Sequence, residues 1–342
     1  MRPGEETRDQ TRGDVAPGRR PWLTGGVLLL AAVPIVAAAL VVGTGTLDDV
    51  RFGDTFLALR LQRLAAAFLA GAALASGGVV VQGLFRNPLA SPSILGTNAG
   101  AALGGQSALL AAELVGIERV APELLVPFGC LVGAFGSLAV LLTLLRITDD
   151  LLALLLTGFA LSALFLSLSA FVTSLAQETF ELGRAVVSFS LGGVAGAGRP
   201  QLALALPLVL VGFVAAAGWG RTLDLLLSGE EEARSLGVDV PRVRLWAAVW
   251  TSVLVAGAVS VGGNVSFVGL VVPHALRPFA GVAHRQLLPL AAIAGGLFVV
   301  LADVVARALP AQGEVPLGVV TGLIGAPLFL GLLARMRREL TA

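Results

Sequence analysis

The chain has 342 residues, of which 56% are hydrophobic and 13% charged, and its formal net charge is +1. Soluble domains carry about a quarter charged residues, so this composition excludes an ordinary soluble fold, and the balanced charge gives no sign of a nucleic-acid partner. All 23 basic residues are arginine. Because a Walker A phosphate-binding loop needs a lysine, the chain cannot be a standard P-loop ATPase.

The first 20 residues are polar and rich in Arg, Gly and Pro, which predicts a disordered cytoplasmic tail over 1–20. Arg19 and Arg20 precede an apolar run, as they would in a secretory or twin-arginine signal. That run, 22–42, is too long for a signal segment and leads to no small-residue cleavage site. We therefore expect a retained first membrane helix with its N-terminus in the cytoplasm.

The rest of the chain, 21–342, is divided by its charges into long apolar runs. An uncharged helix of about 20 residues crosses the roughly 30 Å hydrocarbon layer, and seven runs reach that length. Three shorter or interrupted segments bring the number to ten, which predicts an all-α polytopic membrane protein with both termini on one side. In chain order, the ten segments are 21–47, 64–85, 87–112, 124–145, 151–177, 200–220, 245–263, 267–280, 286–308 and 315–334.

The arginines fix the expected orientation of these segments. With the N-terminus inside, 16 arginines lie on the inner side and 7 on the outer side, the sense of the positive-inside rule. The run 151–177 contains no acidic residue, so an acidic relay for proton or sodium coupling is not indicated. From the residues alone, its hydroxyls are expected to satisfy backbone carbonyls or bridge helices. We single out Thr157, Ser162, Ser167, Ser169 and Thr173.

A charged segment, 228–244, interrupts the apolar pattern between the sixth and seventh segments. Ser228 and Glu231 fit a capping box, Gly237 suits a helix end, and Asp239 with Pro241 suits a helix start. These signals predict two short cytoplasmic helices with a small apolar patch at Ala233 and Leu236. An ordinary solvated loop is the alternative, but a compact, capped element favours a docking site for a separate ATPase.

The two histidines and the single cysteine do not have the spacing of a metal site. Cys130 lies within an apolar run, so no disulfide or thiolate site is expected. We expect structural hydrogen bonds for His274 and an exposed position for His284. No cofactor is expected.

Several motifs in order along the chain carry a family resemblance. The pattern Gly-Glu-x-x-Ala-Arg-x-Leu-Gly at 229–237 resembles the coupling region of ABC importer permeases of the FecCD type. The stretches 60–104, 265–289 and 314–330 are similar to further blocks of that family, and the likeness covers roughly 22–337. Such permeases carry iron-siderophores, haem or cobalamin.

The resemblance implies a type II importer fold in the bacterial cytoplasmic membrane and a second permease subunit, identical or similar. Cytoplasmic ATPase subunits and an extracytoplasmic binding protein complete the importer, which works by alternating access, so the permease itself is not an enzyme. The fifth and tenth helices would line the pathway, and the hydroxyls of the run 151–177 would give it a mildly polar wall. The alternative is that these hydroxyls satisfy backbone carbonyls or bridge helices. The implied ATPase contacts are Gly229, Glu230, Ala233, Arg234, Leu236 and Gly237.

The resemblance also assigns three arginines expected on the outer side, Arg60, Arg63 and Arg307, to docking of the binding protein. The alternatives are interfacial anchors for the first two and an i,i+4 pair of Arg307 with Asp303. Gln62 stands where the family often has proline. Phe189 and Gly193 replace the family's frequent tryptophan and serine near the expected outer mouth.

Iron-siderophore is the expected cargo because it is the commonest role in the family, with haem or cobalamin as alternatives. A secondary transporter would show acidic residues within its membrane helices and inverted repeats. An intramembrane enzyme would need a catalytic set such as H-E-x-x-H or G-x-S-x-G, which the chain does not contain.

Overall fold

The computed structural model describes residues 21–43, 53–114, 122–145, 151–309 and 314–341. The tail predicted over 1–20 lies outside these residues. The described chain is helical throughout, with thirteen α-helices and a 3-10 turn, η1 (Pro92–Leu95). The long helices are α1 (Pro21–Val41), α2 (Gly53–Leu84), α3 (Thr97–Leu114), α4 (Pro122–Leu145), α5 (Leu151–Ala176), α7 (Arg199–Gly218), α10 (Val240–Gly262), α12 (His284–Ala308) and α13 (Leu317–Thr341). The shorter ones are α6 (Phe180–Leu191), α8 (Gly220–Leu227), α9 (Glu230–Ser235) and α11 (Val268–Ala280).

Each of the ten predicted segments falls on one of these helices, which confirms the all-α membrane fold. Eight helices are long and apolar enough to cross a membrane; α3 and α11 are not among them. The predicted segment 87–112 is helical only from Thr97, because Pro88 and Pro92 interrupt the chain before it. The remaining short helices, α6, α8 and α9, lie in the connections between spans.

Burial separates a packed centre from exposed helices. Within the apolar windows of α2 and α10, 78% of the residues are buried, against 6% for α1, 17% for α5 and 22% for α13. The central α2 packs against α7, α10, α11 and α12. Because apolar side chains cover α1, α5 and α13, these helices present surfaces suited to lipid or to another subunit.

Glycine residues allow the backbones of the central helices to come into direct contact. A Cβ atom on Gly71 of α2 would lie 2.1 Å from the carbonyl oxygen of Gly295 on α12. One on Gly78 would lie 1.9 Å from the carbonyl oxygen of Gly269 on α11. Between membrane helices, such close backbone contact takes the place of a hydrophobic driving force.

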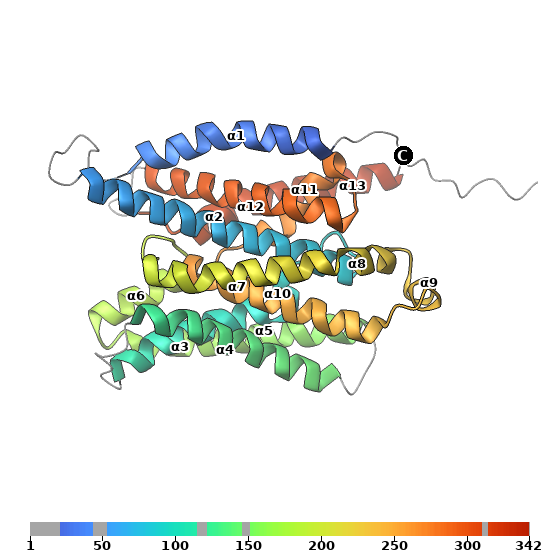
Figure 1. The fold of residues 1–342 in the computed structure, drawn as a ribbon. Helices are drawn as coiled ribbons and strands as arrows, with labels where there is room; N and C mark the ends of the chain where they lie inside the picture. Colours follow the sequence, from blue (N-terminus) through green and yellow to red (C-terminus); the bar gives the residue numbers. More distant parts are fainter. Residues whose placement is uncertain (1–20, 44–52, 115–121, 146–150, 310–313, 342) are drawn as a thin grey trace, which may run out of the picture.

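The helices run roughly along one direction, so the bundle has two ends (Figure 1). The short helix α9 projects at one end, which we call the α9 end, and α6 lies near the other, which we call the α6 end. The first helix begins, and α13 finishes, at the α9 end. This arrangement agrees with an even number of crossings.

Candidate functional site

The helix α9 is set off from the bundle by a sharp turn. Gly229, with φ +128°, breaks the chain after α8, and α9 begins at Glu230. The predicted capping box is wrong, because the N-cap of α9 is Gly229, and Ser228 keeps helical backbone angles at the end of α8. An N-cap residue needs a non-helical backbone to aim its hydroxyl at the following amides.

The end of α9 follows the sequence prediction more closely. Gly237 has φ +84°; its N–H donates to the carbonyl of Arg234 at 2.9 Å, and that of Val238 donates to Ala233 at 3.0 Å. This pair of bonds is a Schellman motif and confirms Gly237 as the terminator. Asp239 is confirmed as an N-cap, since its Oδ1 accepts from the N–H of Arg242 at 3.2 Å.

The helix that Asp239 begins is α10, a 23-residue membrane span. The prediction of a second short helix is therefore wrong. Pro241 sits in the first turn of this span, where its missing N–H costs no hydrogen bond. As a result α9 is joined to the membrane helix by the three residues Leu236–Val238 and its cap.

The predicted apolar patch on α9 is divided by the fold. Ala233 is 0% exposed and belongs to the hydrophobic core, whereas Leu236 is 65% exposed. The guanidinium side chain of Arg234 is also exposed, at 58%. Of the residues that the family resemblance assigns to the ATPase, Arg234, Leu236 and Gly237 are exposed, while Ala233 packs into the core beneath the helix.

Glu230 does not face the same way as these residues. Its carboxylate accepts a hydrogen bond from Nη2 of Arg244 on α10. It also lies 3.7 Å from the guanidinium of Arg234 and 3.8 Å from that of Arg86, just beyond the end of α2. One acidic side chain therefore joins α9 to two helices of the buried centre.

A second polar contact at the α9 end corrects the prediction for His284, which is buried at 3% exposure. Its Nδ1 lies 2.7 Å from Oδ1 of Asp224 on α8, and the same oxygen accepts from the His284 backbone N–H at 2.8 Å. Burial raises the pKa of the Asp224 carboxyl, but the hydrogen bonds from His284 outweigh it and hold that pKa below its ordinary value. The contact ties α8 to the start of α12.

His274 differs from its prediction as well. Its Nδ1 is buried on α11 and has no hydrogen-bond partner among the described residues. Cys130 is buried on α4 as a free thiol. Within the described part of the chain, no group of three His, Cys, Asp or Glu side chains lies close enough to hold a metal ion.

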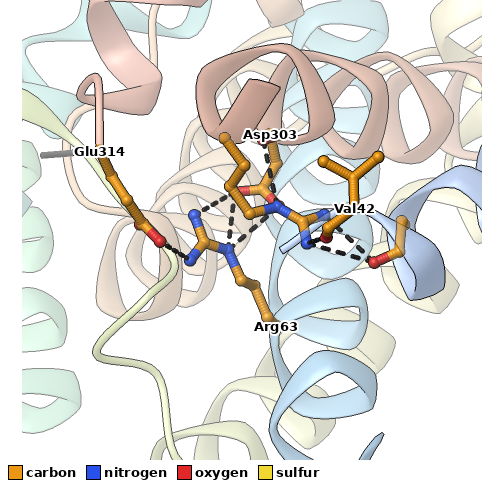
Figure 2. Close-up of polar contacts among 6 residues, drawn as sticks. Val42, Arg63, Asp303 and Glu314 are labelled. Atoms are coloured by element: carbon orange, nitrogen blue, oxygen red, sulfur yellow. Dashed lines mark hydrogen bonds and ion pairs between the residues drawn. The ribbon is translucent and has the colours of Figure 1, made fainter. Parts of the chain in front are cut away.

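At the α6 end, the three arginines assigned to docking come together in one cluster. We call Arg60, Arg63 and Arg307, with Asp303 and Glu314, the arginine cluster. Arg63 donates to both oxygens of Asp303, with Nη2 at 2.9 Å and Nε at 3.0 and 3.1 Å, and its Nη1 donates to Glu314 at 2.8 Å. Figure 2 shows Arg63 between these two acids. Nε of Arg307 lies 3.1 Å from Asp303, which confirms the i,i+4 pair.

The other arginine contacts satisfy the last carbonyl groups of α1. Arg60 donates to the carbonyls of Leu40 and Val41, and Arg307 donates to those of Ala39 and Val42. The last four carbonyls of a helix lack partners within it, and cations there are favoured by the helix dipole. All three arginines border a cavity of about 210 Å³ together with Glu314. Docking of a binding protein at this cavity stays a prediction.

The hydroxyls of α5 bond mainly to their own helix. Ser162, Ser167 and Thr173 donate to carbonyls four residues earlier, at 2.8, 3.0 and 2.8 Å. Ser169 is buried, with an oxygen that has no partner in the described structure, and Thr157 is half-buried. Carbonyl satisfaction is therefore confirmed for three of the five, and a pathway role stays a prediction.

This chain resembles known membrane permeases in both sequence and fold. The model of the FecCD transport family matches residues 24–335. The chain belongs to the FecCD transport family. Three relatives are permeases: the Fe(3+) dicitrate permease FecD of Escherichia coli (39% identity; 81% of this chain, 84% of the relative), the cobalamin permease BtuC of Halobacterium salinarum (38%; 92% and 81%) and the hemin permease HmuU of Yersinia pestis (35%; 94% and 98%).

A solved structure supports the same conclusion. A metal-chelate type ABC transporter in an inward-facing conformation shares 31% identity, with a TM-score of 0.80 over 92% of this chain and 99% of the other. The chain is a multi-pass ABC importer permease of the FecCD family. FecCD permeases carry no ATPase site of their own, in keeping with a chain that has no lysine for a Walker A loop.

Proposed function

We propose that this FecCD permease carries an iron(III) chelate of the siderophore class from an extracytoplasmic binding protein into the cytoplasm. The observation that carries the proposal is the 39% identity with a Fe(3+) dicitrate permease. The solved metal-chelate transporter, at 31% identity, supports the same chemical class. Haem and cobalamin are the alternatives, supported by relatives at 35% and 38% identity.

In the proposed orientation, the α9 end faces the cytoplasm of a bacterium and the α6 end faces outward. The support is the arginine distribution, 16 inside and 7 outside in this orientation. Both termini then lie in the cytoplasm.

The ATPase subunits would dock on α9. An exposed leucine beside an exposed arginine, on a helix that projects from the bundle, suits a groove in a partner. Gly229 and Gly237 set the direction of the helix, and Ala233 and Glu230 fix it to the bundle. ATP-driven closure of the ATPase pair would move α9 and switch the permease between its two access states.

The binding protein would dock over the arginine cluster. Among the described residues, three arginines border an open cavity, and their guanidinium groups suit an acidic side chain of a partner. Asp303 already holds Arg63 and Arg307 in place, so little side-chain freedom would be lost on docking.

A second permease subunit would cover the exposed faces of α5 and α13, and the pathway would run between the subunits. Thr157, Ser162, Ser167, Ser169 and Thr173 would then give its wall scattered hydroxyls. Because most of these hydroxyls bond their own helix, the wall would pass a large solute without holding it.

The test is uptake by the permease reconstituted with its ATPase and binding protein in liposomes. We expect ATP-dependent uptake of a ferric siderophore, and none when the Walker lysine of the ATPase subunit is replaced. Uptake of haem or cobalamin without ferric chelate would overturn the cargo. Uptake driven by an ion gradient in the absence of ATP would overturn the transporter class.

A further inference from the structure

Three consecutive glutamates begin α9, and only the first is turned toward the bundle. The side chain of Glu230 is 25% exposed and contacts Arg244, Arg234 and Arg86. Glu231 and Glu232 are exposed and form no ion pair with any described residue. All three residues carry the same charge and lie in the same helix. A comparison of Glu230 with its exposed neighbours therefore separates the effect of the inward contacts from the effect of the charge itself.

The contacts of Glu230 reach two different parts of the centre. Arg244 lies in the second turn of α10, a helix that packs against α2, α3, α4 and α7. Arg86 follows the end of α2, the other most buried helix. Among the ion pairs of the described residues, those that connect α9 to other helices all pass through this one carboxylate.

The backbone at Arg86, one of the partners of Glu230, has an unusual conformation. Arg86 has φ +48°, a left-handed conformation that few residues other than glycine adopt. It closes α2 with a Schellman motif, since its N–H donates to Gly83 at 3.2 Å and that of Asn87 donates to Gln82 at 3.2 Å. Glycine is usual here, and a strained arginine directed at Glu230 is an outlier of the kind found at switch regions.

The segment that begins at Arg86 also leads into the centre of the permease. Residues 86–96 connect α2 to η1 and α3, and η1 packs against α5. Ser162 of α5 donates to the carbonyl of Ser93 in η1 at 3.2 Å. A displacement at Arg86 is therefore applied to the chain that contacts α5, and a displacement at Arg244 is applied to α10.

We propose that Glu230 is a positioning residue that transmits the movement of α9 to α2 and α10, and does not itself contact the ATPase. The proposal rests on the proposed function, because it takes α9 to be the docking helix. Because the Glu230 carboxylate contacts both Arg86 and Arg244, a movement of α9 would displace the end of α2 and the start of α10 together. The buried Ala233 supplies only apolar contact. Transmission requires such a physically connected contact between the moving element and the responding ones.

The experiment compares Glu230→Gln with Glu231→Gln in the assembled importer. Both changes remove one negative charge from the first turn of α9, but only the first removes the inward contacts. Three quantities are measured: co-purification of the ATPase, the rate of ATP hydrolysis, and substrate imported per ATP hydrolysed. For Glu230→Gln we expect normal co-purification and hydrolysis, with import per ATP lowered by about fivefold, the lower range of typical coupling between sites. Glu231→Gln should leave all three unchanged.

A cycle with Arg244→Gln tests the contact itself. If Glu230 acts through Arg244, the double variant should lose no more coupling than the more severe single variant. Additive losses, or import per ATP unchanged in Glu230→Gln, would overturn the transmitting role. Loss of co-purification in Glu230→Gln would overturn it too, and would make Glu230 a docking contact while leaving the proposed function standing. Failure of the proposed function looks different, because the unmodified importer would then show no ATP-dependent uptake.

Discussion

The two ends of this permease use arginine in opposite ways. In the arginine cluster, Asp303 is 2% exposed and bonds two guanidinium groups, and Arg60 and Arg307 end the first helix. At the α9 end, Glu230 is partly exposed and gathers three arginines around one carboxylate. Buried ion pairs cost much to break, whereas partly exposed ones contribute little to stability.

This difference suggests that the α6 end is built to stay fixed and the α9 end to move. The arginine cluster locks α1, α2, α12 and the segment before α13 together at their ends. The side chains that meet at Glu230, its own included, are 25–58% exposed, against 3–17% for Asp303, Arg63 and Arg307. Four substitutions test this contrast, from the largest expected effect to the smallest.

Replacing Asp303 should have the largest effect on stability. Asp303→Asn leaves the guanidinium groups of Arg63 and Arg307 without their shared carboxylate in a buried site. Removing one partner of a buried pair typically costs about 3–5 kcal/mol, so a large fall in the thermal unfolding temperature of the detergent-purified permease is expected. Stability equal to that of the unmodified chain would show that the cluster is not a fixed joint.

Charge reversal at Arg234 should act on assembly instead. Arg234→Glu changes an exposed side chain, so thermal stability should hardly change. Affinity for the ATPase subunits should fall by about tenfold or more, corresponding to about 1.4 kcal/mol, measured by titrating ATPase into permease liposomes. Arg184→Glu, an exposed arginine on α6 at the opposite end, is the matched control and should bind as before.

The contact between Asp224 and His284 predicts that the local stability of α8, at the α9 end, depends on pH. Its pKa is lowered in the folded state, so the contact with His284 stabilises α8 above the ordinary value of 3.8 and loses this effect as the pH falls through the folded pKa. Hydrogen exchange of 220–227, corrected for intrinsic rates, should accelerate as the pH falls below about 4. Asp224→Asn should lower the free energy of local opening of α8 by about 1 kcal/mol, so exchange becomes faster at neutral pH. The variant should also lose the acid limb, which is the acceleration of exchange below about pH 4. An unchanged acid limb in this variant would assign it to another group.

Replacing Glu314 should have the smallest effect. Its side chain is 44% exposed, and among the described residues it bonds only Arg63. Arg63 would still be bonded to Asp303 after the replacement. Glu314→Gln should cost less than about 1 kcal/mol, measured by the same thermal unfolding as Asp303→Asn. A cost similar to that of Asp303→Asn would mean that exposure does not rank the pairs of the cluster.

Sequence patterns predicted most properties that depend on neighbouring residues, although the capping box at Ser228 and the second short helix were wrong. The ten predicted membrane segments follow from runs of uncharged residues, because a backbone in lipid must satisfy its own hydrogen bonds within a helix. The caps at Gly237 and Asp239 follow from the conformations that glycine and aspartate favour. Family membership follows from motifs spread along the chain, and both the family match and the solved relative confirm it.

Tertiary structure decided which side chains are buried and which partners they meet. His284 reads as part of an exposed turn, but Asp224, 60 residues earlier, holds it in the bundle. Ala233 and Leu236 read as one patch, but the packing of α9 buries the first and exposes the second. Arg63 meets Asp303 across 240 residues. Local sequence sets the helices and their ends, because those energies act over a few residues; contacts such as these depend on how distant helices pack, which only the folded bundle fixes.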